Sequence, residues 1–139
     1  MSVLPCYNLK LRQADRVLTN YYDDALRDSG ITVAQFSILR ALTYLQQPSQ
    51  KALQDVLVLQ QTTLTRNLKP LIRDGYVSTM PSPEDKRVTL VSLTASGKAL
   101  FKTAKRRWDQ VQRRVEEHLG PDLTRQLLAL SDSVLELRK

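Results

Sequence analysis

Apolar residues recur at intervals of three and four along most of the chain, which is the spacing of one face of an α-helix. Typical helix-capping residues and glycines mark the limits of these stretches, among them Thr32, Ser49, Gly75 and Thr94. The pattern predicts five helices over residues 8–28, 33–46, 50–57, 61–74 and 95–119. Gly120-Pro121 then predicts a break, followed by a last helix to the C-terminal end.

The spacing of apolar residues changes to two at residues 76–80 and again at residues 88–93, which predicts two β-strands. The polar segment 81–87 between them is rich in turn residues, so the two strands form a hairpin with a long tip. Helix, short helix, turn, helix and hairpin follow in the order of a winged helix-turn-helix. The predicted fold is therefore mainly α with a small β-hairpin wing.

One face of the predicted helix 61–74 is suited to contact DNA. At about 100° per residue, four polar side chains fall in one stripe: Thr62, Arg66, Lys69 and Arg73. The opposite stripe is apolar and predicted to be buried: Leu64, Leu68, Leu71 and Ile72. Hydroxyls and cations of this kind contact base edges and phosphates. A solvated basic surface helix is the alternative, and Pro70 within the helix and Val58 in the preceding turn fit a helix-turn-helix less well.

The tip of the predicted hairpin carries two cations, Lys86 and Arg87, and one carboxylate, Asp85. An arginine on a narrow protrusion can enter the minor groove of DNA, where the negative potential is concentrated. Asp85 is better suited to fix Arg87 or another arginine by a charge-assisted hydrogen bond. The alternative is an ordinary solvated loop.

The composition agrees with a polyanionic partner. Twenty-one Lys and Arg against fourteen Asp and Glu give a net charge of +7 and a pI near 9.8. No apolar run approaches the ~18 residues of a membrane span, and the N-terminus lacks the apolar core of a signal peptide, so we expect a cytoplasmic protein. A single histidine, the absence of a glycine-rich phosphate loop and the lack of a His/Cys cluster argue against an enzyme, a metal site or a bound cofactor.

The terminal helices have longer apolar stripes than a chain of 139 residues can cover. We therefore predict a single domain over residues 1–139, in which residues 1–30 and 95–139 form a helical dimerisation region and residues 31–94 a winged-helix DNA-binding region. A two-fold homodimer would place two recognition helices in successive major grooves, about 34 Å apart. A helical cap within one chain is the alternative, and a winged helix used only for protein–protein contact also stays open.

Several segments together resemble the MarR family of bacterial transcriptional regulators: Gln35–Leu39, Thr62–Asn67, Asp74–Val77, and Asp85-Lys-Arg87 followed by Leu93-Thr-Ala-Ser-Gly97. The resemblance implies an obligate dimer that binds palindromic operator DNA and usually represses. It implies recognition-helix contacts by Gln61, Thr62, Thr63 and Arg66, a wing arginine at Arg87 and its acidic partner at Asp85. Gln60 and Val58 depart from the Asp and Gly that are frequent in the family.

The resemblance also implies release of DNA by a small phenolic or anionic ligand, or by oxidation of a cysteine. Five residues are candidates to line the ligand pocket, or else belong to the core and surface: Arg16, Tyr21, Tyr22, Phe36 and Trp108. Cys6, the one cysteine, lies about two residues before the reactive cysteine of peroxide sensors in this family, and Arg12 replaces a tyrosine expected nearby. The two interpretations are a peroxide-sensing thiol and an unremarkable buried thiol.

Overall fold

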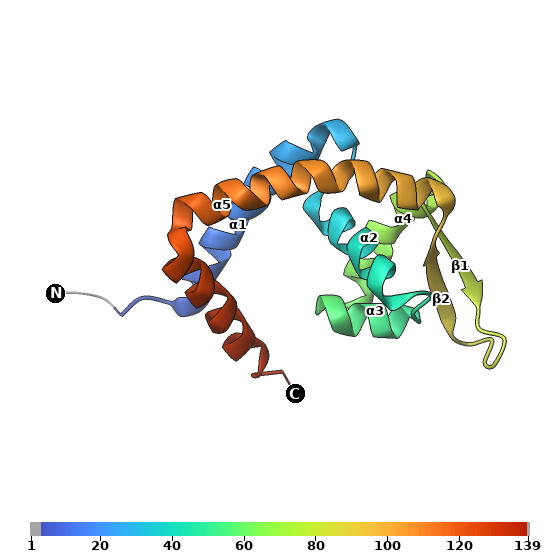
Figure 1. The fold of residues 1–139 in the computed structure, drawn as a ribbon. Helices are drawn as coiled ribbons and strands as arrows, with labels where there is room; N and C mark the ends of the chain where they lie inside the picture. The colour runs from blue at the N-terminus through green and yellow to red at the C-terminus, as the bar shows by residue number, and fades with distance from the viewer. Residues whose placement is uncertain (1–3, 139) are drawn as a thin grey trace.

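The computed structural model of the chain describes residues 4–138. The helices and strands follow in the order α1 (Tyr7–Leu26), the 3-10 turn η1 (Arg27–Ser29), α2 (Val33–Leu45), α3 (Gln50–Leu57), α4 (Gln61–Arg73), β1 (Val77–Pro81), β2 (Thr89–Leu93) and α5 (Ala95–Leu135). Figure 1 shows α5 lying across α1 and α2, with the hairpin of β1 and β2 projecting from the body. The mainly helical fold with a β-hairpin wing is confirmed.

Three predicted helix starts are confirmed by hydrogen bonds of their capping side chains. The Thr32 hydroxyl accepts from Gln35 N at 3.2 Å, and the Gln35 side chain accepts from Thr32 N at 3.0 Å. Ser49 accepts from Ala52 N at 3.0 Å, and Thr94 accepts from Gly97 N at 3.0 Å. These bonds satisfy backbone N–H groups that have no partner inside their own helix.

The predicted limits of several elements were wrong by one or two residues. The first helix ends at Leu26 rather than 28, since η1 tightens its last turn before Gly30, whose φ is +75°. Helices α2 and α4 each end one residue earlier than predicted. The strands occupy 77–81 and 89–93 instead of 76–80 and 88–93, because the turn at the tip takes up Val88.

The break predicted at Gly120 is present within α5. Gly120 has φ +78° and ψ 168°, so the backbone leaves the helical conformation there and Pro121 starts a second helical segment. Figure 1 shows the chain turning at this point, so that the C-terminal segment runs back beside the open side of the molecule. The last predicted helix is therefore the second segment of α5, residues 121–135, which forms a C-terminal arm.

The wing is an antiparallel hairpin whose register pairs Val77 with Leu93 and Pro81 with Thr89. The segment before α3 extends it, since Ser49 forms a β-bridge with Leu90 and Val91 N donates to Pro48 O at 2.9 Å. These bonds fix the wing to the start of α3.

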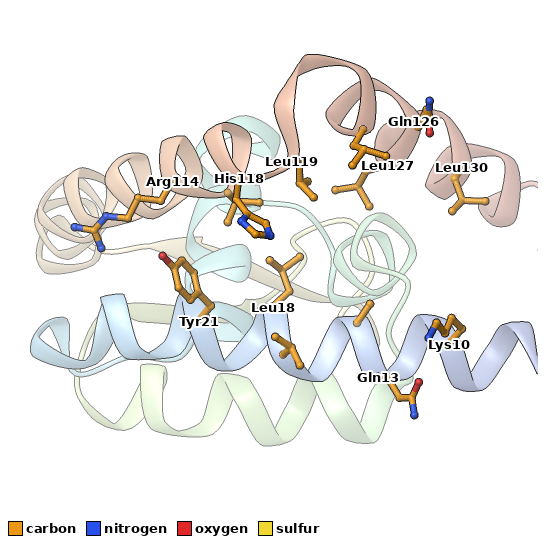
Figure 2. A pocket seen from close by; sticks show the side chains of 14 residues that line it. Lys10, Gln13, Leu18, Tyr21, Arg114, His118, Leu119, Gln126, Leu127 and Leu130 are labelled. Atoms are coloured by element: carbon orange, nitrogen blue, oxygen red, sulfur yellow. The ribbon is translucent and has the colours of Figure 1, made fainter.

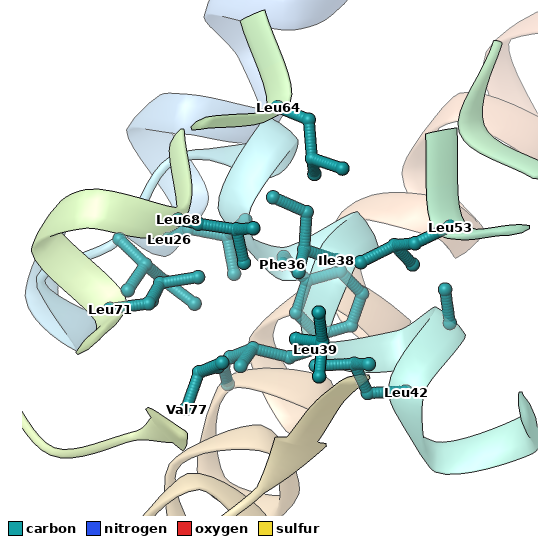
Figure 3. Packing of buried hydrophobic residues seen from close by; sticks show 14 residues of the cluster. Leu26, Phe36, Ile38, Leu39, Leu42, Leu53, Leu64, Leu68, Leu71 and Val77 are labelled. Carbon is teal, nitrogen blue, oxygen red and sulfur yellow. The ribbon is translucent and has the colours of Figure 1, made fainter. Parts of the chain in front are cut away.

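The core lies under α2 and is formed by side chains from most of the elements (Figure 3). Phe36 of α2 stacks on Phe101 and Trp108 of α5, with ring centroids 5.3 and 5.6 Å apart. Leu64, Leu68 and Leu71 of α4 are buried as predicted, but Ile72 is 41% exposed. At about 100° per residue, Ile72 lies at the edge of the apolar stripe of α4, on the side next to the outward-facing stripe.

The turn between α3 and α4 is held in a strained conformation. Val58 has φ +55° and ψ +50°, the left-handed region that a β-branched residue rarely adopts. Its N–H donates to Asp55 O at 3.3 Å, which closes the end of α3. The conflict seen in the sequence at Val58 is thus real, and the packing of α3 and α4 on the core holds the turn in place.

The surroundings of Gly97 explain why the Leu93-Thr-Ala-Ser-Gly97 segment ends in glycine. The start of α5 passes so close to β1 that a Cβ atom at Gly97 would lie 2.0 Å from the carbonyl oxygen of Tyr76 and 3.1 Å from the Leu93 side chain. Thr94 N donates to the same Tyr76 oxygen at 3.1 Å. The glycine therefore allows the wing and α5 to meet.

We expect Gly97→Ala to lower the free energy of unfolding by about 3 kcal/mol or more, because a backbone carbonyl cannot move aside as a side chain can. Urea unfolding followed by circular dichroism measures the change. Ser96→Ala, at the exposed neighbouring position, is the control and should change stability by less than about 0.5 kcal/mol. A Gly97→Ala protein as stable as the control would show that this close approach is absent.

Candidate nucleic-acid interface

The outward face of α4 carries exposed polar side chains while its leucines are buried. Gln61, Thr62, Arg66 and Lys69 are all exposed, and Thr63 is half-buried. The leucines determine this orientation, since their spacing of four and three positions turns one side of the helix to the core. Gln60, the residue before the helix, makes no side-chain capping bond to the first turn of α4.

Arg66 is a cation that no carboxylate neutralises within residues 4–138. Its Nη2 donates a long hydrogen bond of 3.5 Å to the Thr63 hydroxyl. Arg73 lies on the same outward stripe, but it donates to both carboxylate oxygens of Asp74, at 3.1 and 3.3 Å. This hydrogen bonding lowers the pKa of Asp74 and raises that of Arg73. Arg66 is therefore the more available of the two guanidinium groups.

At the wing, the Asp85 carboxylate accepts hydrogen bonds from both the backbone and the guanidinium group of Arg87. Arg87 Nε donates to Asp85 Oδ1 at 3.1 Å, its Nη2 donates to Oδ2 at 3.2 Å, and its backbone N donates to Oδ1 at 3.1 Å. The side chain of Arg87 is nevertheless 91% exposed, and Lys86 beside it is exposed as well. The carboxylate thus orients the guanidinium and leaves it accessible to a ligand. The hydrogen bonds from Arg87 lower the pKa of Asp85.

The five residues predicted as walls of a ligand pocket have different surroundings in the structure. Phe36 is buried in the core, and Trp108 stacks on it. The Tyr22 hydroxyl donates to Gln112 Oε1, and burial, with a smaller effect of Glu116, raises its pKa. Arg16 is exposed on α1, and only Tyr21 reaches the groove described below. The spacing within each helix could not show that Phe36 and Trp108 pack together in the core while Tyr21 lines a groove elsewhere.

A cation that has no place in the predicted pocket, Arg40, lies against Trp108 and Tyr44. The Arg40 guanidinium is 5.1 Å from the ring centroid of Trp108 and 5.7 Å from that of Tyr44. The separation of four residues between Arg40 and Tyr44 suggests contact on one helix. The pairing with Trp108 joins α2 to α5 and has no signal in the sequence.

A groove of about 1080 Å³ runs between α1 and the part of α5 on either side of Gly120 (Figure 2). Its walls are mostly apolar and come from both helices: Ala14, Val17, Leu18, Val115, Leu119, Leu123, Leu127 and Leu130. Lys10, Arg114 and His118 add cationic or titratable groups to the same groove. The apolar stripes that seemed too long for one chain thus face this groove.

The Cys6 thiol is exposed at the start of α1, so the interpretation as a buried thiol was wrong. Within residues 4–138 no three His, Cys, Asp or Glu side chains gather as metal ligands would. Across the same part of the chain, none of the helices is both long and apolar enough to cross a membrane.

A helix-turn-helix with an exposed cationic second helix, followed by a hairpin with an oriented arginine, defines a winged-helix DNA-binding protein. The model of the MarR family matches residues 31–89. The chain is 33% identical over 125 residues to the multiple antibiotic resistance protein MarR of Escherichia coli K12, covering 90% of this chain and 79% of that protein. The chain therefore belongs to the MarR family.

Two solved structures with DNA have the same fold. The Mycobacterium tuberculosis transcriptional regulator MosR in complex with DNA gives a TM-score of 0.83 at 34% identity, over 97% of this chain and 100% of that one. A mutant of Escherichia coli MarR complexed with operator DNA gives 0.83 at 26% identity, over 92% of each chain. The homoprotocatechuate degradative operon repressor of Escherichia coli is 25% identical over 129 residues, 93% of this chain and 87% of that protein.

We expect the pKa of the Asp85 carboxyl to lie below the value of an ordinary aspartate, about 3.9, and to rise toward it in Arg87→Ala. Because the folded-state pKa is lowered, the contact stabilises the protein at neutral pH and is lost as the pH falls through that pKa. Carboxyl carbon shifts in an NMR titration measure both values. Lys86→Ala, which removes the neighbouring cation, is the control, and an unchanged pKa in Arg87→Ala would contradict the contact.

Proposed function

We propose that the protein is a homodimeric transcriptional repressor that binds a near-palindromic operator and releases it when a small molecule binds. The observation that carries the proposal is the pair of accessible guanidinium groups, Arg66 on α4 and Arg87 on the wing. A DNA-binding role in transcriptional regulation follows from the family; the operator, the repression and the release are the proposal.

In the proposed complex, α4 enters the major groove. Gln61, Thr62, Thr63 and Arg66 lie on its first two turns, the part of a recognition helix that contacts base edges, and Lys69 lies one turn further for a phosphate. Arg87 enters the adjacent minor groove, oriented by Asp85, and Lys86 contacts the backbone near it. Asp85 serves to hold Arg87 and does not itself contact DNA.

A second copy of the chain is the proposed occupant of the groove between α1 and α5. Leucines that line it remain exposed in the single chain, including Leu123 at 52% and Leu130 at 51%. Covering them with the equivalent helices of a partner removes apolar surface from water at about 25 cal/mol per Å². A two-fold contact there also repeats α4 on the second subunit, as a near-palindromic operator requires.

The relatives support the regulatory part of the proposal. One of them is named as the repressor of a degradative operon. For release, we propose a small phenolic or anionic ligand near Arg40 and Trp108, where a cation lies on an aromatic ring between α2 and α5. The proposed site of action is the cytoplasm, where operator DNA lies. Repeating the DNA-binding measurement below with added phenolic acids tests the release.

We expect Arg66→Ala and Arg87→Ala each to weaken binding to DNA selected by the wild-type protein from a random library by about 1–3 kcal/mol, roughly 5- to 150-fold. Arg66→Ala should also lower discrimination against scrambled DNA. Fluorescence anisotropy over a salt series measures affinity and the number of phosphate contacts. Arg125→Ala, an exposed arginine beside Asp122 on the C-terminal arm, is the matched control. Wild-type protein that binds no DNA at low salt would refute the proposal.

Leu127→Asp should convert the dimer to a monomer, because it places a carboxylate in the apolar groove. Sedimentation velocity measures the change in mass. Val56→Asp, at a 56% exposed position on α3 outside the groove, is the control and should leave the mass of a dimer. A Leu127→Asp protein that remains dimeric would place the subunit contact elsewhere.

A further inference from the structure

A hydrogen bond between two surface side chains joins α3 to the proposed recognition helix. Gln50 Nε2 donates to the Thr65 hydroxyl oxygen at 3.3 Å. Gln50 is half-buried at the first position of α3, directly after the capping residue Ser49, and Thr65 is exposed in the second turn of α4. Neither residue belongs to the buried core.

The position of Thr65 places it at the edge of the DNA-facing stripe of α4. At about 100° per residue, it lies roughly 60° from Thr62 around the helix, on the side toward α3, and it directly precedes Arg66. The first helix of a helix-turn-helix crosses the DNA backbone. The Gln50–Thr65 pair therefore joins α4, which contacts the bases in the proposed complex, to α3, which lies over the DNA backbone there.

The hydroxyl of Thr65 does not make the bond to its own helix that several other helical threonines make, and Thr63, which accepts from Arg66, shares this property. Thr43, Thr103 and Thr124 each donate to the carbonyl oxygen four residues earlier in their own helix, at 3.0, 3.1 and 2.7 Å. Thr65 instead accepts from Gln50, and its O–H makes no hydrogen bond to another group within residues 4–138. A hydroxyl that accepts one bond still has a hydrogen to donate.

We propose that Thr65 donates this hydrogen to an acceptor of bound DNA, a phosphate oxygen or a base-edge atom, and that Gln50 is the positioning residue that holds the hydroxyl for it. The inference rests on the proposed DNA-binding function. Gln50 fixes the oxygen through one of its two amide N–H bonds, so the rotation of the hydroxyl is restricted before DNA arrives. The contact extends recognition from α4 to the start of α3.

The test compares isosteric variants of the full-length protein on two duplexes. One duplex is selected by the wild-type protein from a random library, and the other is a scrambled sequence of the same composition. Thr65→Val removes the hydroxyl, Thr65→Ser retains it, and Gln50→Met removes the amide while keeping its length. Thr103→Val, an exposed threonine on α5, is the matched control. Thermal unfolding of each variant shows whether it is folded.

We expect Thr65→Val and Gln50→Met each to weaken binding to the selected duplex by about three- to tenfold, the effect of one neutral hydrogen bond. The double variant should bind no more weakly than Thr65→Val alone, because Gln50 acts through the hydroxyl. Thr65→Ser should restore wild-type affinity. A loss equal on both duplexes identifies a phosphate acceptor, and a loss on the selected duplex alone identifies a base.

Wild-type affinity in a folded Thr65→Val protein would overturn the inference while leaving the proposed function intact. Additive losses in the double variant would overturn the positioning role of Gln50. A wild-type protein that binds neither duplex would refute the proposed function and this inference with it.

Discussion

The stacking of Phe36 on Phe101 and Trp108 is the contact on which the rest of the molecule depends. It attaches α2, at the centre of the winged region, to the long helix α5, which also lines the groove with α1. Since Phe36 and the leucines of α4 share one core, the orientation of the recognition helix is fixed relative to that groove.

The two arginines of the proposed DNA-binding surface differ from the charged residues of the protein that pair with close neighbours on a helix. Most ion pairs lie on exposed helices between neighbours, as with Lys51 and Asp55, and such pairs add little stability. Arg87 is held at the wing by Asp85 and still points to solvent, while Arg66 has no acidic partner within residues 4–138. The two cations in the proposed DNA contact are thus both accessible, and Asp85 orients one of them.

Two local conflicts lie just before α4, and Gln46 and Gln47, which follow α2, also have positive φ. Val58 adopts a left-handed backbone and Gln60 provides no side-chain cap, whereas the starts of α2, α3 and α5 are capped by Thr32, Ser49 and Thr94. Exceptions to local rules are expected where a surface serves binding. The strain at Val58 is carried by the packing of Leu53 and Leu64 on either side of the turn.

Residue spacing by itself determined the order of the elements, the caps, the break at Gly120 and the orientation of α4, because each depends on neighbours within a few positions. The exact ends of helices and the exposure of Ile72 depended on what packs beside them. Long-range packing alone decided that Phe36 joins the core, that Arg40 stacks on Trp108 and that Gln50 bonds to Thr65. Periodicity gives the face of a helix on which a side chain lies; only the tertiary structure decides which other helix meets that face.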